Sequence, residues 1–327
     1  MAETEARRGA GAVGPCLAVP VVAGRSRRRE GEGADPGRRH IPVAAAPPGH
    51  YHPAMRTEMD TVPAAEGAAA FEVIAGRVDA GLVLICDHAS SHVPPEYASL
   101  GLPPAEFERH IAYDIGAAAL TRALAARFGV PAVLSHFSRL LIDPNRGLDD
   151  PTLIMRLSDG AVVPGNAKID AAERARRIAR FYRPYDDAVN AAIEAGMASG
   201  RLPMILSIHS FTASWKGVPR PWHAGILWDA DPRLARPLID GLARDPAIVV
   251  GDNEPYHGAL KGDTLYRHAT RRGLAHALVE VRQNLIADDD GVAAWADRLA
   301  GVLTELNIGS TPHAIEHFGS LTGPMID

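Results

Sequence analysis

From about residue 70 onward, short apolar runs alternate with longer stretches whose apolar residues recur every three or four positions. The short runs are apolar on both faces, which is typical of strands buried in a parallel sheet. They occupy residues 81–86, 131–135, 139–143, 203–208, 224–228, 247–250 and 276–281. The stretches of helical period lie around 105–127, 170–198, 232–244, 263–272 and 289–306. Strands separated by helices predict an α/β fold with a mostly parallel mixed sheet covered by helices.

The first 65 residues differ in kind from the rest. They are rich in Arg, Gly, Ala and Pro and lack apolar periodicity, so they cannot bury enough surface to offset the entropy of the chain. We therefore predict a disordered tail over 1–65, one folded domain over 70–308 and a C-terminal tail over 309–327.

Composition gives no general reason to expect nucleic acid or a membrane as partner. The net charge is -5 at pH 7, and no apolar stretch approaches the roughly 18 residues of a membrane-spanning helix. An Arg-rich run in the first 65 residues leaves a nucleic-acid-binding tail as one alternative. Only two cysteines occur, which favours a reducing, cytoplasmic setting.

Four polar clusters directly follow or complete apolar runs. They are CDHAS (86–90), DPNRG (143–147), SIHSF (207–211) and VEVRQN (279–284). Because ligands of open α/β sheets bind beyond the carboxyl ends of the strands, we expect these clusters to form the functional site.

His88 and His209 each end a different apolar strand beside small residues. A single histidine there is usually structural, but two of them suit Zn²⁺, which takes three protein ligands and a water in catalytic sites. The residues leave the third ligand open between Asp114, Asp87 and His92. We expect Asp114 to lie on a helix and reach in.

Glu280 lies inside the apolar segment ALVEVRQ. A buried carboxylate is costly without a partner, so its presence needs a reason. Glu280 either forms an ion pair with an arginine such as Arg282, or acts as the general base that takes a proton from a zinc-bound water.

The segment SRLLIDPNRG supplies Arg139, Asn145 and Arg146 within a short distance along the chain. Arginine binds carboxylates in a bidentate way and asparagine can add a hydrogen bond, so an acidic substrate is expected. The alternative is a plain turn in which Asp143 and Asn145 bond to their own backbone. Both interpretations can hold together.

Ser138 and Ser210 raise the alternative of a serine hydrolase, but neither lies in a G-x-S-x-G elbow. The sequence also lacks a Walker motif and a convincing G-x-G-x-x-G motif, which argues against a nucleotide cofactor.

Read together, eight blocks of the sequence resemble, in this order, the N-formylglutamate amidohydrolase family. The blocks are CDHASSHVP, HIAYDIGA, FSRLLIDPNRGLDDPTL, FYRPYDDAVN, ILSIHSFT, DNEPYHG, GDTLYRHA and ALVEVRQNLI. They span roughly residues 80 to 306. The resemblance implies a fold similar to that of the zinc exopeptidases (phosphorylase/hydrolase-like), a catalytic domain over 70–308, and hydrolysis of N-formyl-L-glutamate to formate and L-glutamate, as in histidine degradation.

The resemblance also implies a role for each matching residue. His88 and His209 are expected to bind one Zn²⁺, Glu280 to act as general base, Asn145 and Arg146 to bind a substrate carboxylate, and Arg139 to polarise the scissile carbonyl. One feature departs from the H-x-x-E motif of zinc carboxypeptidases, because Ser91 stands three positions after His88. Asp114 is therefore predicted as the third ligand in preference to His92.

Two alternatives remain beside this interpretation. The first keeps the zinc site but changes the substrate to another N-acyl amino acid or a small peptide. The second is a non-catalytic binding module on the same fold, which would not need His88, His209 and Glu280 to converge.

Overall fold

The computed structural model describes residues 69–309 and 311–324. The tail predicted over 1–65, and with it the alternative of a nucleic-acid-binding tail, lies outside the described residues.

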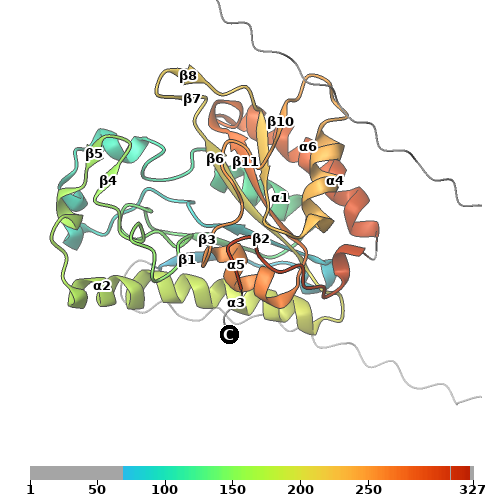
Figure 1. The fold of residues 1–327 in the computed structure, drawn as a ribbon, viewed down its shortest axis with the longest axis horizontal. Coiled ribbons are helices and arrows are strands. Elements are labelled where there is room, and N and C mark those ends of the chain that lie inside the picture. Colours follow the sequence, from blue (N-terminus) through green and yellow to red (C-terminus); the bar gives the residue numbers. More distant parts are fainter. Residues whose placement is uncertain (1–68, 310, 325–327) are drawn as a thin grey trace, which may run out of the picture. The chain divides into compact units, whose positions relative to one another are not determined.

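A seven-stranded sheet forms the centre of the described chain (Figure 1). Its strands are β1 (Phe71–Ile74), β2 (Leu82–Cys86), β3 (Ala132–Ser135), β6 (Met204–Phe211), β9 (Ala224–Leu227), β10 (Val250–Asp252) and β11 (His276–Arg282), in the spatial order β1-β3-β2-β6-β11-β9-β10. The pairs β3–β2, β2–β6, β6–β11 and β9–β10 are parallel, whereas β1–β3 and β11–β9 are antiparallel. The predicted α/β fold with a mostly parallel mixed sheet is confirmed.

Helices cover both faces of this sheet. They are α1 (Ala117–Phe128), α2 (Ala171–Arg177), α3 (Arg183–Ala198), α4 (Pro232–Leu242), α5 (Thr264–His268) and α6 (Asp289–Ile308). Helices α1, α4 and α6 pack on one face and α3 and α5 on the other (Figure 1). Two short hairpins, β4–β5 (Leu157–Ser158, Ala161–Val162) and β7–β8 (Ser214–Trp215, Val218–Pro219), lie outside the main sheet.

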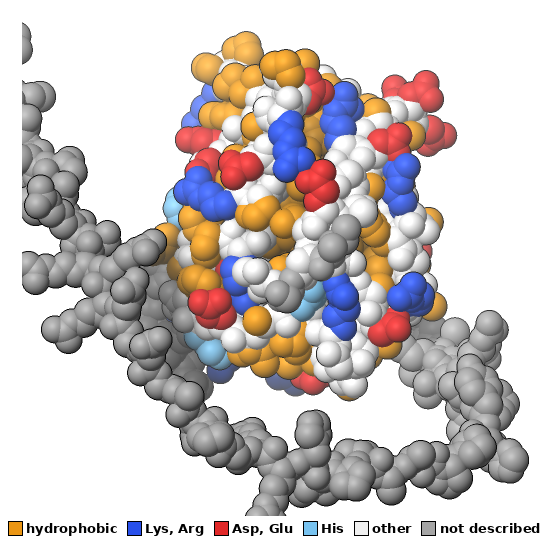
Figure 2. Space-filling model, turned by 90° about the vertical axis from the view of Figure 1, so that its right-hand side faces the viewer, with side chains coloured by type: hydrophobic (Ala, Val, Ile, Leu, Met, Phe, Trp, Pro, Cys, Tyr) orange, Lys and Arg blue, Asp and Glu red, His pale blue; other side chains and the backbone are white. Residues whose placement is uncertain are grey.

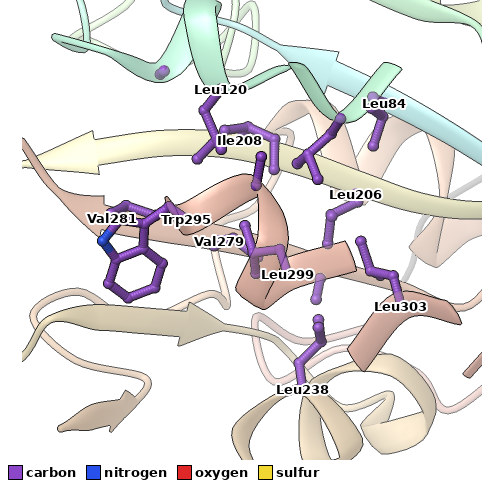
Figure 3. Close-up of a cluster of buried hydrophobic side chains, with 14 of the residues drawn as sticks. Leu84, Leu120, Leu206, Ile208, Leu238, Val279, Val281, Trp295, Leu299 and Leu303 are labelled. Atoms are coloured by element: carbon purple, nitrogen blue, oxygen red, sulfur yellow. The ribbon is translucent and has the colours of Figure 1, made fainter. Parts of the chain in front are cut away.

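The alternation of side chains along β6 divides its residues between two cores. Leu206 and Ile208 face α1 and α6, where Figure 3 shows them among leucines and valines of the neighbouring elements. Ser207 and His209 therefore face the side of α3 and α5. In the parallel register, Glu280 of β11 lies directly beside His209. The polar residues of the site thus share one face of the sheet.

The strand predicted over 139–143 is wrong. Leu140, Leu141 and Ile142 are fully buried, but the segment forms a turn in which the Leu141 amide donates to the Ser138 carbonyl. The apolar run fills the core beside α3 without pairing with a strand. A short apolar run identifies burial, and burial alone does not distinguish a strand from a packed turn.

The helix predicted over 105–127 begins later than expected, because α1 starts at Ala117 after Gly116, whose φ is 81°. Asp114 consequently lies in the loop before α1, not on a helix. Its backbone amide donates to the His88 carbonyl (2.9 Å), which holds this loop against the end of β2.

The segment predicted as the C-terminal tail contacts the folded domain where it is described. It carries a short 3-10 helix at Thr311–His313, and further along the Glu316 amide donates to the Gly273 carbonyl. The Leu321 amide donates to the Asp229 carboxylate (2.8 Å).

On the face shown in Figure 2, basic and acidic side chains are interspersed without a large patch of either sign. None of the helices in the described ranges is long and apolar enough to cross a membrane.

Candidate metal and catalytic site

His88, Asp114 and His209 converge at the carboxyl ends of β2 and β6. Each offers one ligand atom, and these atoms lie within 4.8 Å of one another. Nδ1 of His209 is 2.8 Å and Nδ1 of His88 3.4 Å from Oδ2 of Asp114. All three side chains are buried. The structure therefore brings together the three residues predicted to bind the metal.

A second carboxylate contacts each imidazole at its other ring nitrogen, Nε2. Nε2 of His88 lies 2.7 Å from Oδ1 of Asp143, and Nε2 of His209 lies 3.1 Å from Oδ2 of Asp87. Burial alone would lower the pKa of His209, but carboxylates at both ring nitrogens raise it to about 10, which places a proton between its Nδ1 and Asp114. A divalent cation bound there would replace this proton, and the carboxylates at Nε2 would leave the Nδ1 lone pairs of both histidines to ligate the cation. The donor set fits a zinc ion.

Asp87 is buried among hydrogen-bond donors. Its Oδ1 accepts from the hydroxyls of Thr264 (2.6 Å) and Tyr185 (3.0 Å), and its Oδ2 accepts from the hydroxyl of Ser207 (3.0 Å). Burial alone would raise the pKa of Asp87, but the contacts with His209 and Thr264 lower it to about 2. Asp87 is thus an ionised anchor for His209.

Arg139 supplies positive charge to the same cluster. Its guanidinium donates to Oδ2 of Asp143 (2.9 Å) and to Oδ1 of Asp114 (3.4 Å). Although burial opposes ionisation, Arg139 and His88 hold the pKa of Asp143 well below its usual range. The side chain of Arg139 remains 18% exposed and lines the central cavity.

Glu280 stands in a different environment from the aspartates. Its Oε2 is buried and has no hydrogen-bond partner within the described residues. Burial raises its pKa to about 7, against the lowering effect of His209. The alternative ion pair with Arg282 does not form, since that guanidinium donates to Asn284 and to the Arg220 carbonyl. A carboxylate with such a pKa can accept and release a proton near neutrality.

A cavity of about 430 Å³ joins these groups, which is an ordinary size for a small-molecule site. Of the residues predicted for the site, it is lined by His88, Asp114, Arg139, Asn145, Arg146, His209 and Glu280. His88, His209 and Glu280 therefore converge. A catalytic site requires this convergence, whereas a non-catalytic binding module does not.

Asn145 and Arg146 form part of a turn as well as of the cavity wall. The Asn145 amide donates to Oδ1 of Asp143 (3.0 Å), as the turn alternative predicted. Oδ1 of Asn145 in turn accepts from the Thr264 amide (3.1 Å). Arg146 donates to the Asn145 carbonyl (2.9 Å) and forms no ion pair within the described residues, and its side chain lines the cavity.

The other candidate residues from the sequence, which are His92, Ser138 and Ser210, do not join the cluster of ligand atoms. His92 lies apart from the cluster, with its ring 5.9 Å from that of His136. Ser138 and Ser210 donate their hydroxyls to the carbonyls of Ala112 and Ile115 (both 2.8 Å), so neither is paired with a general base.

The sequence did not identify Asp143, Tyr185 and Thr264 as supports of the site. Their partners lie far away along the chain, between 55 and 177 positions in the contacts described above. The only available signal was the buried strand end or turn in which Asp87 and Asp143 occur. Asp263, the N-cap of α5, is a further buried acid of the cavity whose pKa burial raises to about 7.

Comparison with known proteins identifies relatives of the described domain. A family model described as N-formylglutamate amidohydrolase matches residues 80–287. The crystal structure of a gene product of Agrobacterium tumefaciens is 34% identical with a TM-score of 0.68, and the match covers 73% of this chain and 96% of that one. The structure of N-formylglutamate amidohydrolase from Ralstonia eutropha JMP134 is 24% identical with a TM-score of 0.54, covering 73% and 97%; this likeness shows a shared fold. No curated protein matches the sequence.

The raised pKa of Asp263 predicts a pH-dependent stability. Between its unfolded value of 3.8 and its folded value of about 7, the folded state keeps a proton that the unfolded state releases. The free energy of unfolding should therefore fall as pH rises through this window, by up to about 1.4 kcal/mol per pH unit from this group. Asp263→Asn keeps a capping oxygen but removes the titration, so its stability relative to wild type should increase from pH 5 to pH 8.

Urea unfolding of both proteins at the two pH values measures this difference. Asp288→Asn, at the exposed N-cap of α6, controls for the general effect of replacing a capping aspartate. An equal difference between Asp263→Asn and wild type at pH 5 and pH 8 would contradict the assignment.

Proposed function

The chain belongs to the N-formylglutamate amidohydrolase family and is a hydrolase acting on an amide bond, and on this premise we propose that it hydrolyses N-formyl-L-glutamate to formate and L-glutamate with one divalent metal ion. The observation that carries the proposal is the convergence of His88, Asp114 and His209 beside Glu280 in one cavity. Zn²⁺ is the metal that the mixed nitrogen and oxygen donors favour.

The chain's own residues would hold the metal and fix its ligands. Nδ1 of His88, Nδ1 of His209 and a carboxylate oxygen of Asp114 are the ligand atoms. Asp143 and Asp87 orient the two imidazoles through Nε2. When bound, the ion supplies a water of lowered pKa and polarises a carbonyl.

Glu280 acts as the general base in this proposal. Its unpartnered Oε2 takes the proton of the attacking water and passes it to the departing amine. Its position beside His209 on the neighbouring strand puts it next to the metal ligands. Burial keeps its proton affinity close to that needed at neutral pH.

Arg146 and Asn145 bind a carboxylate of the glutamate half of the substrate. Arg146 lines the cavity and forms no ion pair within the described residues, so a ligand carboxylate would pair with it. Arg139 stabilises the negative charge that develops on the carbonyl oxygen, with the part of its guanidinium that faces the cavity.

Another N-acyl amino acid or a small peptide is the alternative substrate, because the cavity is larger than a formyl group needs.

The reaction would take place in the cytoplasm, in a chain whose one described cysteine, Cys86, is buried as a free thiol. Cytoplasmic location and a role in histidine degradation stay predictions.

Glu280→Gln provides the direct test of the reaction. The substitution keeps the shape of the side chain but removes the base, so kcat for formate release from N-formyl-L-glutamate should fall about 10²–10⁴-fold. The assay uses the full chain loaded with zinc, with formate measured by a coupled dehydrogenase.

Glu305→Gln, at the surface pair with Arg244, is the matched control and should keep wild-type turnover. Wild-type protein that is folded and zinc-loaded but releases no formate would overturn the proposed substrate. Equal turnover by Glu280→Gln and wild type would remove Glu280 as the base.

Arg146→Ala should act on binding more than on turnover. Loss of one charged hydrogen-bonding partner should raise KM for N-formyl-L-glutamate about tenfold to a hundredfold while kcat changes little. Steady-state kinetics measures kcat and KM of this variant. Arg298→Ala, at an exposed arginine, serves as the control. A fall in kcat at unchanged KM would assign Arg146 to the chemical step instead.

A further inference from the structure

The cavity extends along β11, well beyond the metal ligands. His276, Leu278 and Glu280 alternate with core residues, so they lie on one face of the strand, and all three line the cavity. At about 3.3 Å per residue, the distance along the strand from Glu280 to His276 is about 13 Å. A formyl group held at Glu280 would occupy only the first part of this length.

The walls of this inner part are apolar. Leu278 of β11 pairs with Leu227 of β9, and Leu265 of α5 also lines the cavity. These three leucines are only 4–6% exposed, yet each lines the cavity. We call the space that they line, together with Tyr266 and His276, the inner chamber.

The floor of the inner chamber is polar but internally satisfied. Nδ1 of His276 donates to the Leu274 carbonyl (2.7 Å), and its Nε2 accepts from the Thr270 hydroxyl (3.0 Å). Burial lowers the pKa of His276, which keeps the ring neutral. The Leu321 amide caps Asp229 at the same end. The floor therefore needs no ionic group from a ligand.

The distribution of charge along the cavity decides which half of an N-acyl-L-glutamate enters the inner chamber. Among the described residues, Arg139 and Arg146 are the arginines that line the cavity, and no lysine lines it. They lie with the metal ligands and the Asn145 turn. In the part of the chain that the structure describes, the inner chamber has no arginine or lysine in its lining, and Asp229 at its floor disfavours a carboxylate. The dicarboxylic glutamate half is thus excluded from the chamber, and the neutral acyl half is accepted.

From this geometry we propose that the inner chamber is an acyl-chain site, and that the enzyme hydrolyses N-acyl-L-glutamates whose aliphatic acyl groups are longer than formyl. The inference rests on the proposed function for the position of the scissile bond. Water adds its oxygen to the acyl carbon, the C–N bond breaks, and the nitrogen takes a proton, so the products are a fatty carboxylate and L-glutamate.

Each methylene that enters the chamber leaves water for an apolar wall. Burial of one methylene corresponds to about a fourfold gain in affinity or in kcat/KM. Two added methylenes, from acetyl to butanoyl, should therefore give roughly a fifteenfold increase. The comparison starts at acetyl because the formyl carbonyl is intrinsically less hindered than the others.

The test measures binding and turnover separately on the zinc-loaded full chain. Isothermal titration of Glu280→Gln with N-formyl-, N-acetyl-, N-butanoyl- and N-hexanoyl-L-glutamate gives Kd without hydrolysis. Release of L-glutamate by the wild type gives kcat/KM for the same series. We expect Kd to tighten and kcat/KM to rise from acetyl to hexanoyl.

Leu278→Phe narrows the chamber and should lower the hexanoyl-to-acetyl ratio of kcat/KM at least tenfold. Leu227→Phe narrows the chamber from the neighbouring strand β9 and replaces Leu278→Phe if circular dichroism shows that variant to be unfolded. Leu148→Phe, an exposed position outside the cavity lining, is the matched control and should keep the wild-type ratio.

The outcomes separate this inference from the proposed function. A Kd that stays constant or weakens from acetyl to hexanoyl overturns the acyl-chain site, even if N-formyl-L-glutamate is hydrolysed. A Kd that tightens along the series without any hydrolysis supports the site and overturns the reaction. An unchanged hexanoyl-to-acetyl ratio in both folded chamber variants also overturns the site.

Discussion

The burial of three aspartates around two histidines is the constraint on which the rest of this structure depends. Asp87, Asp114 and Asp143 lie at the ends of strands and in buried loops, where an unpaired negative charge is costly. Arg139 offsets part of that charge through Asp114 and Asp143. The divalent cation proposed for these ligand atoms would offset part of the remainder and would thereby stabilise the fold around it.

The parallel sheet explains how side chains so distant in sequence meet. β2, β6 and β11 are consecutive in the sheet and parallel, so their carboxyl ends lie at one edge. Alternation then turns His209 and Glu280 to the same face, while Leu206 and Val279 pack into the opposite core (Figure 3). The residues of the site are therefore carried by strands whose two faces are both buried in the core.

The sequence predicted the polar residues that interrupt or follow apolar strands, but it missed the residues that hold these polar side chains in place. His88, His209 and Glu280 stood out because a polar side chain within or directly after a buried strand needs a reason, and the site gives one. Asp143 was interpreted only as a turn residue, because its contact with His88 depends on tertiary packing. The false strand over 139–143 has the same origin, since its burial comes from the core beside α3 and not from strand pairing.

A zinc-binding measurement shows whether His88, Asp114 and His209 hold one metal ion. Equilibrium dialysis of the full chain against buffered Zn²⁺, with the bound metal quantified by mass spectrometry, gives stoichiometry and affinity. We expect one tightly bound ion per wild-type chain, its loss in His209→Ala and Asp114→Ala, and its retention in Asp240→Ala, an exposed position. Equal zinc affinity in all four proteins would show that these residues do not hold the ion.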